Sequence, residues 1–137
     1  MNKKLFLDDV RNPIDCTTYM MNPAIYREEW DIVRNYNDFV SYIEKNGVPD
    51  VISFDHDLAD EHYEAMLKEN AHDPVKQIET IVDYGVEKTG YDCAKWLVDY
   101  CVEKKKKFPP YIVHSMNPAG KERISGYIEN AKQHLGI

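Results

Sequence analysis

The sequence has little cysteine, no excess of positive charge and no long hydrophobic run, and each absence excludes a class of protein. The three cysteines among 137 residues are widely spaced and form no CxxC pair, so they build neither a zinc site nor a disulfide framework. The formal net charge of −7 argues against an extended nucleic-acid surface or binding to anionic membranes. No apolar run is long enough to span a bilayer, and acidic residues follow the amino terminus too soon for a signal peptide. We therefore expect a cytoplasmic protein with reduced thiols.

The standard nucleotide and hydrolase motifs are also missing. The sequence contains no Walker, GxGxxG or GxSxG pattern. Its 43% hydrophobic and 30% charged residues are typical of a globular protein, and its length fits a single domain over residues 1–137. The polar stretch at about 58–89, in which Asp73-Pro74 is a plausible helix start, is predicted to be an excursion over the surface.

Short apolar runs alternate with helical patterns along most of the chain. The predicted strands are 3–7, 31–35, 50–55 and 111–113. Predicted helices begin at Asn37, Thr89-Gly90 and Asn117-Pro118, and the first and last end at Asn46-Gly47 and Gly136. Pro13 and Pro23 indicate a loop with a short helix at about 12–30, near the site. This alternation predicts a three-layer α/β fold with a parallel sheet in the order 2-1-3-4.

Acidic residues follow two of the predicted strands. Asp8 and Asp9 come after the first strand, and Asp55 and Asp57 follow the run Val51–Phe54. In an open α/β sheet, ligands bind beyond the carboxyl ends of the strands, so these carboxylates should share one crevice. Crowded carboxylates repel one another unless a cation neutralises them, and Mg²⁺ prefers oxygen ligands. We expect Asp8, Asp9 and Asp57 to hold a divalent cation such as Mg²⁺, although each acid alone fits helix or turn capping equally well.

Two histidines lie at the same strand ends. His56 stands between two acids, and His114 follows the fourth strand. Both side chains titrate near neutral pH, so they are candidates for general acid and base, with Asp55 and Asp57 orienting them or a metal. The alternative is that each histidine is a hydrogen-bonded structural residue. Groups that could contact a phosphate are found nearby at Arg11, Ser115, Asn117, Gly120 and Lys121.

Four motifs in this order resemble the cyclic-phosphate-processing receiver domain family. They are Asp8-Asp9-Val-Arg-Asn-Pro, Ser-Phe-Asp55-His-Asp57-Leu, Thr89-Gly90-Tyr-Asp and His114-Ser-Met-Asn-Pro-Ala-Gly120. The resemblance implies a receiver-like fold in which Asp8 and Asp9 match the acidic pair that binds Mg²⁺. It also implies that Asp55 or Asp57 matches the phosphoacceptor and Ser115 the small hydroxyl residue after the fourth strand. Unlike true receivers, the chain has no fifth strand with its lysine, and it carries the two histidines.

The function favoured by these patterns is binding and hydrolysis of a small phosphorylated ligand, either a 2′,3′-cyclic phosphate or a cyclic nucleotide. Two alternatives remain open at this point. The same pocket could capture a cyclic nucleotide without turnover, which fits the small size and the lack of an obvious nucleophile. The domain could also be a degenerate receiver that is phosphorylated on Asp55 or Asp57.

Overall fold

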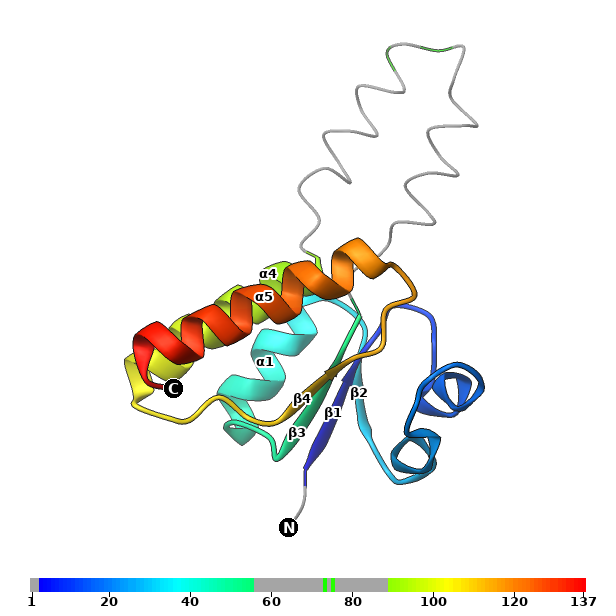
Figure 1. The fold of residues 1–137 in the computed structure, drawn as a ribbon, viewed down its shortest axis with the longest axis horizontal. Coiled ribbons are helices and arrows are strands. Elements are labelled where there is room, and N and C mark those ends of the chain that lie inside the picture. The colour runs from blue at the N-terminus through cyan, green and yellow to red at the C-terminus, as the bar shows by residue number, and fades with distance from the viewer. Residues whose placement is uncertain (1–2, 56–72, 74, 76–88) are drawn as a thin grey trace.

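The computed structural model describes residues 3–55, 73, 75 and 89–137, and shows a four-stranded parallel sheet in the order β2-β1-β3-β4 (Figure 1). The strands are β1 (Lys4–Leu7), β2 (Asp31–Val33), β3 (Val51–Phe54) and β4 (Tyr111–Val113). The predicted fold class and strand order are therefore confirmed, and four strands are found in the described ranges. The predicted excursion at about 58–89, with its helix start at Asp73-Pro74, lies almost entirely outside the described residues.

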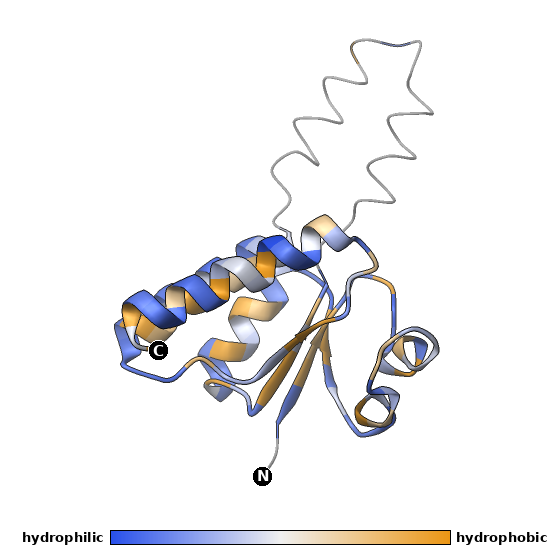
Figure 2. Ribbon diagram, viewed as in Figure 1, coloured by the Kyte–Doolittle hydropathy of each residue, from blue (hydrophilic) through white to orange (hydrophobic). Residues whose placement is uncertain are grey.

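Three α-helices cover one face of the sheet. They are α1 (Tyr36–Asn46), α4 (Gly90–Lys104) and α5 (Pro118–Leu135). Their buried residues form one cluster with alternate strand residues, including Leu5, Leu7, Ile52 and Phe54. Figure 2 shows the corresponding pattern, in which the strands are mainly hydrophobic and the helices carry both hydrophobic and hydrophilic residues. Burial of this face provides the main hydrophobic stabilisation of the fold. None of the described helices is long and apolar enough to cross a membrane.

Two short 3-10 helices cover the opposite face. They are η1 (Pro13–Thr18) and η2 (Pro23–Arg27), and each begins with a proline, which suits the first helical position and cannot continue a longer helix. Phe6 of β1 packs against Cys16, Tyr26 and Trp30 on this side. The segment predicted as a loop with a short helix is thus a second helical layer made of two short pieces.

The helix ends follow from local capping residues. The Thr89 side chain caps α4, Asn117 caps α5 with Pro118 at its first position, and Gly136 ends α5 in the left-handed conformation, as predicted. The prediction that Asn37 caps the first helix is wrong. Asn35 is the cap, and its side chain accepts a hydrogen bond from the Asp38 N–H at 2.8 Å. Both asparagines fit the sequence pattern, but β2 ends at Val33, so the helix can begin two residues earlier.

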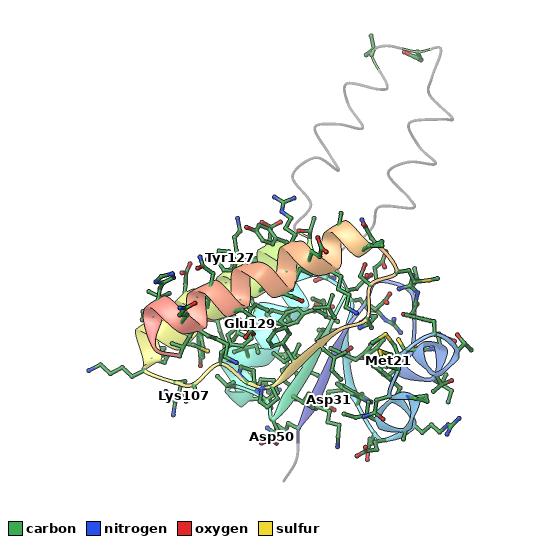
Figure 3. The ribbon with its side chains drawn as sticks, viewed as in Figure 1. Met21, Asp31, Asp50, Lys107, Tyr127 and Glu129 are labelled. Carbon is green, nitrogen blue, oxygen red and sulfur yellow. The ribbon has the colours of Figure 1, made fainter. Side chains whose placement is uncertain are left out.

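The parallel register places the carboxyl ends of the strands at one edge. Leu7 pairs with Val33 and with Phe54, which in turn pairs with Val113, so four strands end level with one another. Asp50 and Lys107 precede β3 and β4, and Figure 3 shows them at the opposite end of the sheet. The residues that follow the strands therefore meet at a single edge, as predicted.

The two asparagines near the start of α1 give a test of the capping assignment. Asn35→Ala removes the side-chain acceptor for the Asp38 N–H and should lower the free energy of unfolding by about 1 kcal/mol. Asn37→Ala changes an exposed residue inside the helix and should change it by less than about 0.5 kcal/mol. Urea unfolding followed by circular dichroism measures both, and a larger loss for Asn37→Ala would contradict the assignment.

Candidate functional site

The sheet hydrogen bonds continue one residue beyond the strands and bring the site residues side by side. The Asp55 N–H donates to the Leu7 carbonyl at 3.0 Å, and the His114 N–H donates to the Phe54 carbonyl at 2.9 Å. Alternation along a strand directs Asp8, Asp55 and His114 to the face that carries Phe6, opposite the three α-helices. One ligand atom from each of these three side chains lies within 4.8 Å of the others.

The side chain of Asp8 is completely buried, and both of its carboxylate oxygens are hydrogen-bonded. Its Oδ1 accepts hydrogen bonds from the N–H groups of Val10 at 2.9 Å and Arg11 at 2.8 Å. Its Oδ2 lies 3.0 Å from His114 Nε2 and 3.4 Å from Arg11 Nη1. Burial acts to raise the pKa of Asp8, but the hydrogen bonds from His114, Arg11 and Val10 outweigh it and lower the pKa to about 2. Asp8 is therefore ionised at neutral pH.

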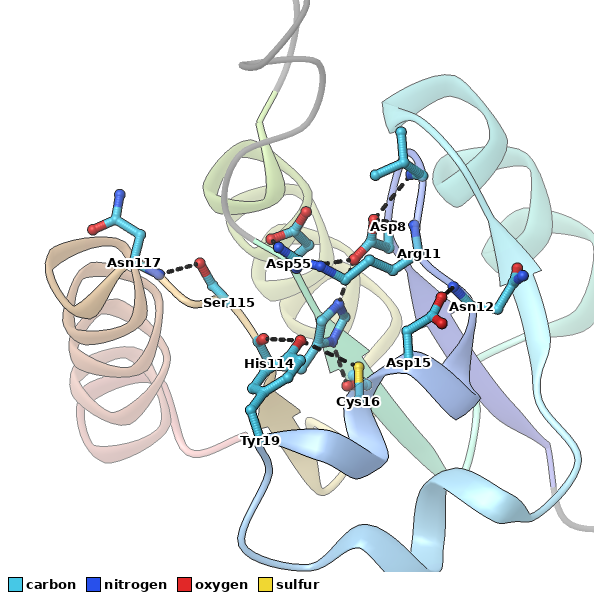
Figure 4. Close-up of polar contacts among 12 residues, drawn as sticks. Asp8, Arg11, Asn12, Asp15, Cys16, Tyr19, Asp55, His114, Ser115 and Asn117 are labelled. Carbon is cyan, nitrogen blue, oxygen red and sulfur yellow. Dashed lines mark hydrogen bonds and ion pairs between the residues drawn. The ribbon is translucent and has the colours of Figure 1, made fainter.

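Arg11 lies between two buried carboxylates. Its Nη1 atom is 3.4 Å from Asp8 Oδ2 and 4.0 Å from Asp55 Oδ1, and its side chain keeps 27% of its exposure. The guanidinium carbon lies 5.8 Å from the centre of the Tyr19 ring. Figure 4 shows Asp8, Arg11 and Asp55 converging above the His114 ring. The site thus has one partly exposed cationic group in contact with acids that have almost no contact with solvent.

Arg34 fixes the loop that carries Arg11, a role that the sequence analysis missed. Its guanidinium donates to the backbone carbonyls of Asp8 and Arg11 and to the Asn12 side chain. Burying or constraining backbone carbonyls requires such donors, because unsatisfied carbonyls cost free energy. No sequence signal identifies Arg34, since these partners are more than 20 positions away in the chain.

His114 is placed at the site but does not face solvent. Its side chain is completely buried, Nε2 contacts Asp8, and Nδ1 lies 2.6 Å from Ser53 Oγ. The ring stacks on Phe6 with 4.4 Å between ring centres. Burial lowers the pKa of His114 more than Asp8 raises it, so the imidazole is neutral at neutral pH. Its role as general acid or base stays a prediction, and the geometry makes it first of all a partner of Asp8.

The predicted phosphate contacts near α5 are partly engaged in capping that helix. The Asn117 N–H donates to Ser115 Oγ at 3.1 Å, and the Asn117 side chain accepts from the Gly120 N–H at 3.2 Å. Ser115 and Gly120 are buried, whereas Asn117 and Lys121 are exposed. Figure 4 shows Asn117 at the start of α5, to one side of the Asp8–Arg11–Asp55 group. A ligand reaching these residues would have to extend along the sheet edge.

Two of the predicted catalytic residues, His56 and Asp57, lie outside the described residues. Their roles as base and metal ligand remain predictions. Asp9 follows Asp8 directly and is half-buried. The sequence analysis did not identify Tyr19, Tyr26 or Ser53, although Ser53 could have been noticed as a hydroxyl inside an apolar strand.

The carboxylates of Asp8 and Asp55 offer the oxygen ligands that a hard divalent cation prefers. Asp8 and Asp55 direct oxygen atoms at a common cationic group, which in this structure is Arg11. His114 is less suited as a ligand, because an ionised Asp8 only accepts hydrogen bonds and Nε2 therefore carries its proton. A bound Mg²⁺ would use Asp8, Asp55 and the neighbouring Asp9, and it would compete with Arg11 for the same oxygens.

The low pKa of Asp8 makes the stability of the protein depend on pH. The folded-state pKa of about 2 lies below the ordinary aspartate value of 3.8, so this stabilisation is complete above about pH 5 and is lost as the pH falls towards 2. The loss should be about 2 kcal/mol, and it should be missing in Asp8→Asn. Urea unfolding over a pH series measures it. Asp99→Asn, which changes an exposed carboxylate of α4, is the control, and equal acid sensitivity of wild type and Asp8→Asn would contradict the assignment.

Comparison with known proteins identifies one family for this chain. Residues 3–130 match the family model of the cyclic-phosphate processing receiver domain. No curated protein and no solved structure matches the chain. The matched range covers all four strands and nearly all of the helices described above. The chain belongs to the family of cyclic-phosphate processing receiver domains.

Proposed function

We propose that this receiver domain binds a small cyclic phosphate at the carboxyl ends of β1, β3 and β4 and hydrolyses it. The observation that carries the proposal is the partly exposed Arg11 guanidinium, which is held over the buried carboxylates Asp8 and Asp55. The family match supports the ligand class, because the family is associated with cyclic-phosphate processing. Binding of a given ligand and its hydrolysis are the parts that need experiment.

Arg11 is suited to hold a phosphate. Guanidinium groups bind phosphate oxygens through two parallel N–H donors. The ion-pair contacts of Arg11 with Asp8 and Asp55 both use Nη1, and the guanidinium carries further N–H donors on Nη2 and Nε. The ion pairs and the Tyr19 ring fix the guanidinium before the ligand arrives, which reduces the entropic cost of binding.

Hydrolysis of a cyclic phosphate adds one water across a P–O bond of the ring. The water oxygen attaches to phosphorus, the ring P–O bond breaks, and one proton of the water ends on the freed ester oxygen. We assign the proton transfers to His56, since His114 is buried with both ring nitrogens in contact with protein groups. Asp55 would orient the water, and a divalent cation, when bound at the acids, would offset the charge of the phosphate.

Two other functions use the same residues. A binding module without turnover would hold the cyclic phosphate through Arg11 and release it intact. A degenerate receiver would instead accept a phosphoryl group on Asp55, which follows β3 as the receiver resemblance implies. The contact of Arg11 with Asp55 favours binding of a cyclic phosphate, with or without hydrolysis, over phosphorylation of Asp55. The reason is that the guanidinium already pairs with that carboxylate, at 4.0 Å from Nη1 to Oδ1.

The first experiment exposes the purified protein to a panel of 2′,3′-cyclic phosphates, cyclic mononucleotides and cyclic oligonucleotides. Each ligand is run with Mg²⁺ and with chelator and is followed by phosphorus NMR. A new monoester signal establishes hydrolysis, and the chelator samples show whether a metal is needed. Broadened but intact signals establish the binding module, and unchanged signals for every ligand contradict the proposal.

Arg11→Gln tests the phosphate contact within the same panel. Loss of charge-assisted hydrogen bonds should weaken binding at least about tenfold, which titration calorimetry with chelator can measure. Arg27→Gln is the matched control, because Arg27 is exposed at the end of η2. Equal affinity of Arg11→Gln and wild type would remove Arg11 from the site.

His56→Ala tests the turnover step separately from binding. Removal of a general acid or base should lower the rate of hydrolysis by about a hundredfold or more while the ligand still binds. His134→Ala, which changes an exposed histidine of α5, should hydrolyse at the wild-type rate. An unchanged rate for His56→Ala would remove this histidine from the mechanism.

A further inference from the structure

A chain of buried polar side chains runs from η2 along one face of the sheet to Asp8. Tyr26 Oη lies 2.8 Å from Ser53 Oγ, and Ser53 Oγ lies 2.6 Å from His114 Nδ1. His114 Nε2 lies 3.0 Å from Asp8 Oδ2. The four residues come from η2, β3 and the ends of β4 and β1, and none is more than 2% exposed. They form a continuous hydrogen-bonded chain without contact to solvent.

The surroundings of this chain are apolar. The His114 ring stacks on Phe6, and the Tyr26 ring stacks on Trp30 with 5.7 Å between their centres. In the sheet, Ser53 is paired with Phe6 on one side and Ile112 on the other. Burying polar groups in such surroundings costs free energy unless each is hydrogen-bonded. An alanine at position 53 would remove the hydroxyl that contacts both Tyr26 and His114, so the serine serves this hydrogen-bonded chain and not packing alone.

The hydrogen bonds of the chain have one consistent direction. An ionised Asp8 can only accept, so His114 Nε2 donates to it. In the neutral imidazole Nδ1 then accepts, and its donor is the Ser53 hydroxyl. The Ser53 oxygen is left to accept from the Tyr26 hydroxyl. Each hydrogen bond of the chain therefore has one donor and one acceptor, and each residue determines the orientation of the next.

We propose that Ser53 and Tyr26 are positioning residues, which hold His114 as the Nε2–H tautomer and thereby fix the Asp8 carboxylate beneath Arg11. Asp8 Oδ1 is already held by two backbone N–H groups, so the bond from His114 fixes the second oxygen. Asp8 Oδ2 is also the atom that contacts Arg11 Nη1. The buried chain thus reaches the guanidinium along the face of the sheet that η1 and η2 cover. The effect of this chain on ligand affinity rests on the proposed function. The tautomer of His114 does not depend on that function.

Nitrogen and carbon NMR of the full chain at neutral pH tests the positioning role without a ligand. In wild type, His114 Nδ1 should give the signal of an unprotonated ring nitrogen and Nε2 that of a protonated one. Ser53→Ala and Tyr26→Phe should shift the Nδ1 signal and the Asp8 carboxyl carbon signal, and Ser53→Thr, which keeps a hydroxyl, should restore both. A protonated Nδ1 in wild type, or unchanged signals in Ser53→Ala, would overturn the proposal.

Ile112→Val is the control for a loss of packing alone. Ile112 is paired with Ser53 and packs on the same face but has no polar group, so its substitution should lower stability and leave both NMR signals unchanged. Ser53→Ala should also weaken cyclic-phosphate binding about fivefold, the effect of one hydrogen bond. An unchanged affinity would overturn the link to the ligand. If wild type itself binds no cyclic phosphate, the proposed function fails, and the NMR signals alone decide on the positioning role.

Discussion

The site depends on one buried carboxylate, Asp8, which must remain ionised inside the protein. Burial alone would raise its pKa, and four donors oppose this: the N–H groups of Val10 and Arg11, the Arg11 side chain and the His114 imidazole. These donors come from the loop after β1 and from the end of β4. The requirement to satisfy one carboxylate therefore ties together the segments that form the edge of the sheet.

The two faces of the sheet have different tasks. The face under the three α-helices is apolar and supplies most of the core. The face under η1 and η2 carries the polar chain from Tyr26 to Asp8, and the Tyr19 hydroxyl of the same layer donates to the His114 carbonyl at 2.7 Å. Two short helices joined by a turn can place Tyr26 at one end of this chain and Tyr19 against the backbone of His114. One long helix along the sheet would present a single stripe of residues.

Arg11 combines two functions in one side chain. It pairs with Asp8 and Asp55, and in the proposed function it is also the cationic group that would contact a phosphate. A cation bound at the acids and Arg11 would therefore share the same carboxylate oxygens. If the proposed function holds, this arrangement lets a protein with a net charge of −7 offer a local site for an anion.

The sequence alone determined the strands, their order, most helix caps and the family, because these follow from short patterns of apolar, capping and motif residues. It also placed Asp8, Asp55 and His114 at one edge, since each directly follows a strand. The tertiary structure decided how deeply each is buried and what it contacts. His114 turns to Ser53 and Asp8, and Arg34 holds the Arg11 loop, because these partners are distant in the chain and are brought together only when the layers pack. Local patterns carry no information on such contacts. The sequence left open whether His114 is an acid-base group or a hydrogen-bonded structural residue, and only the folded protein shows it as a buried partner of Asp8.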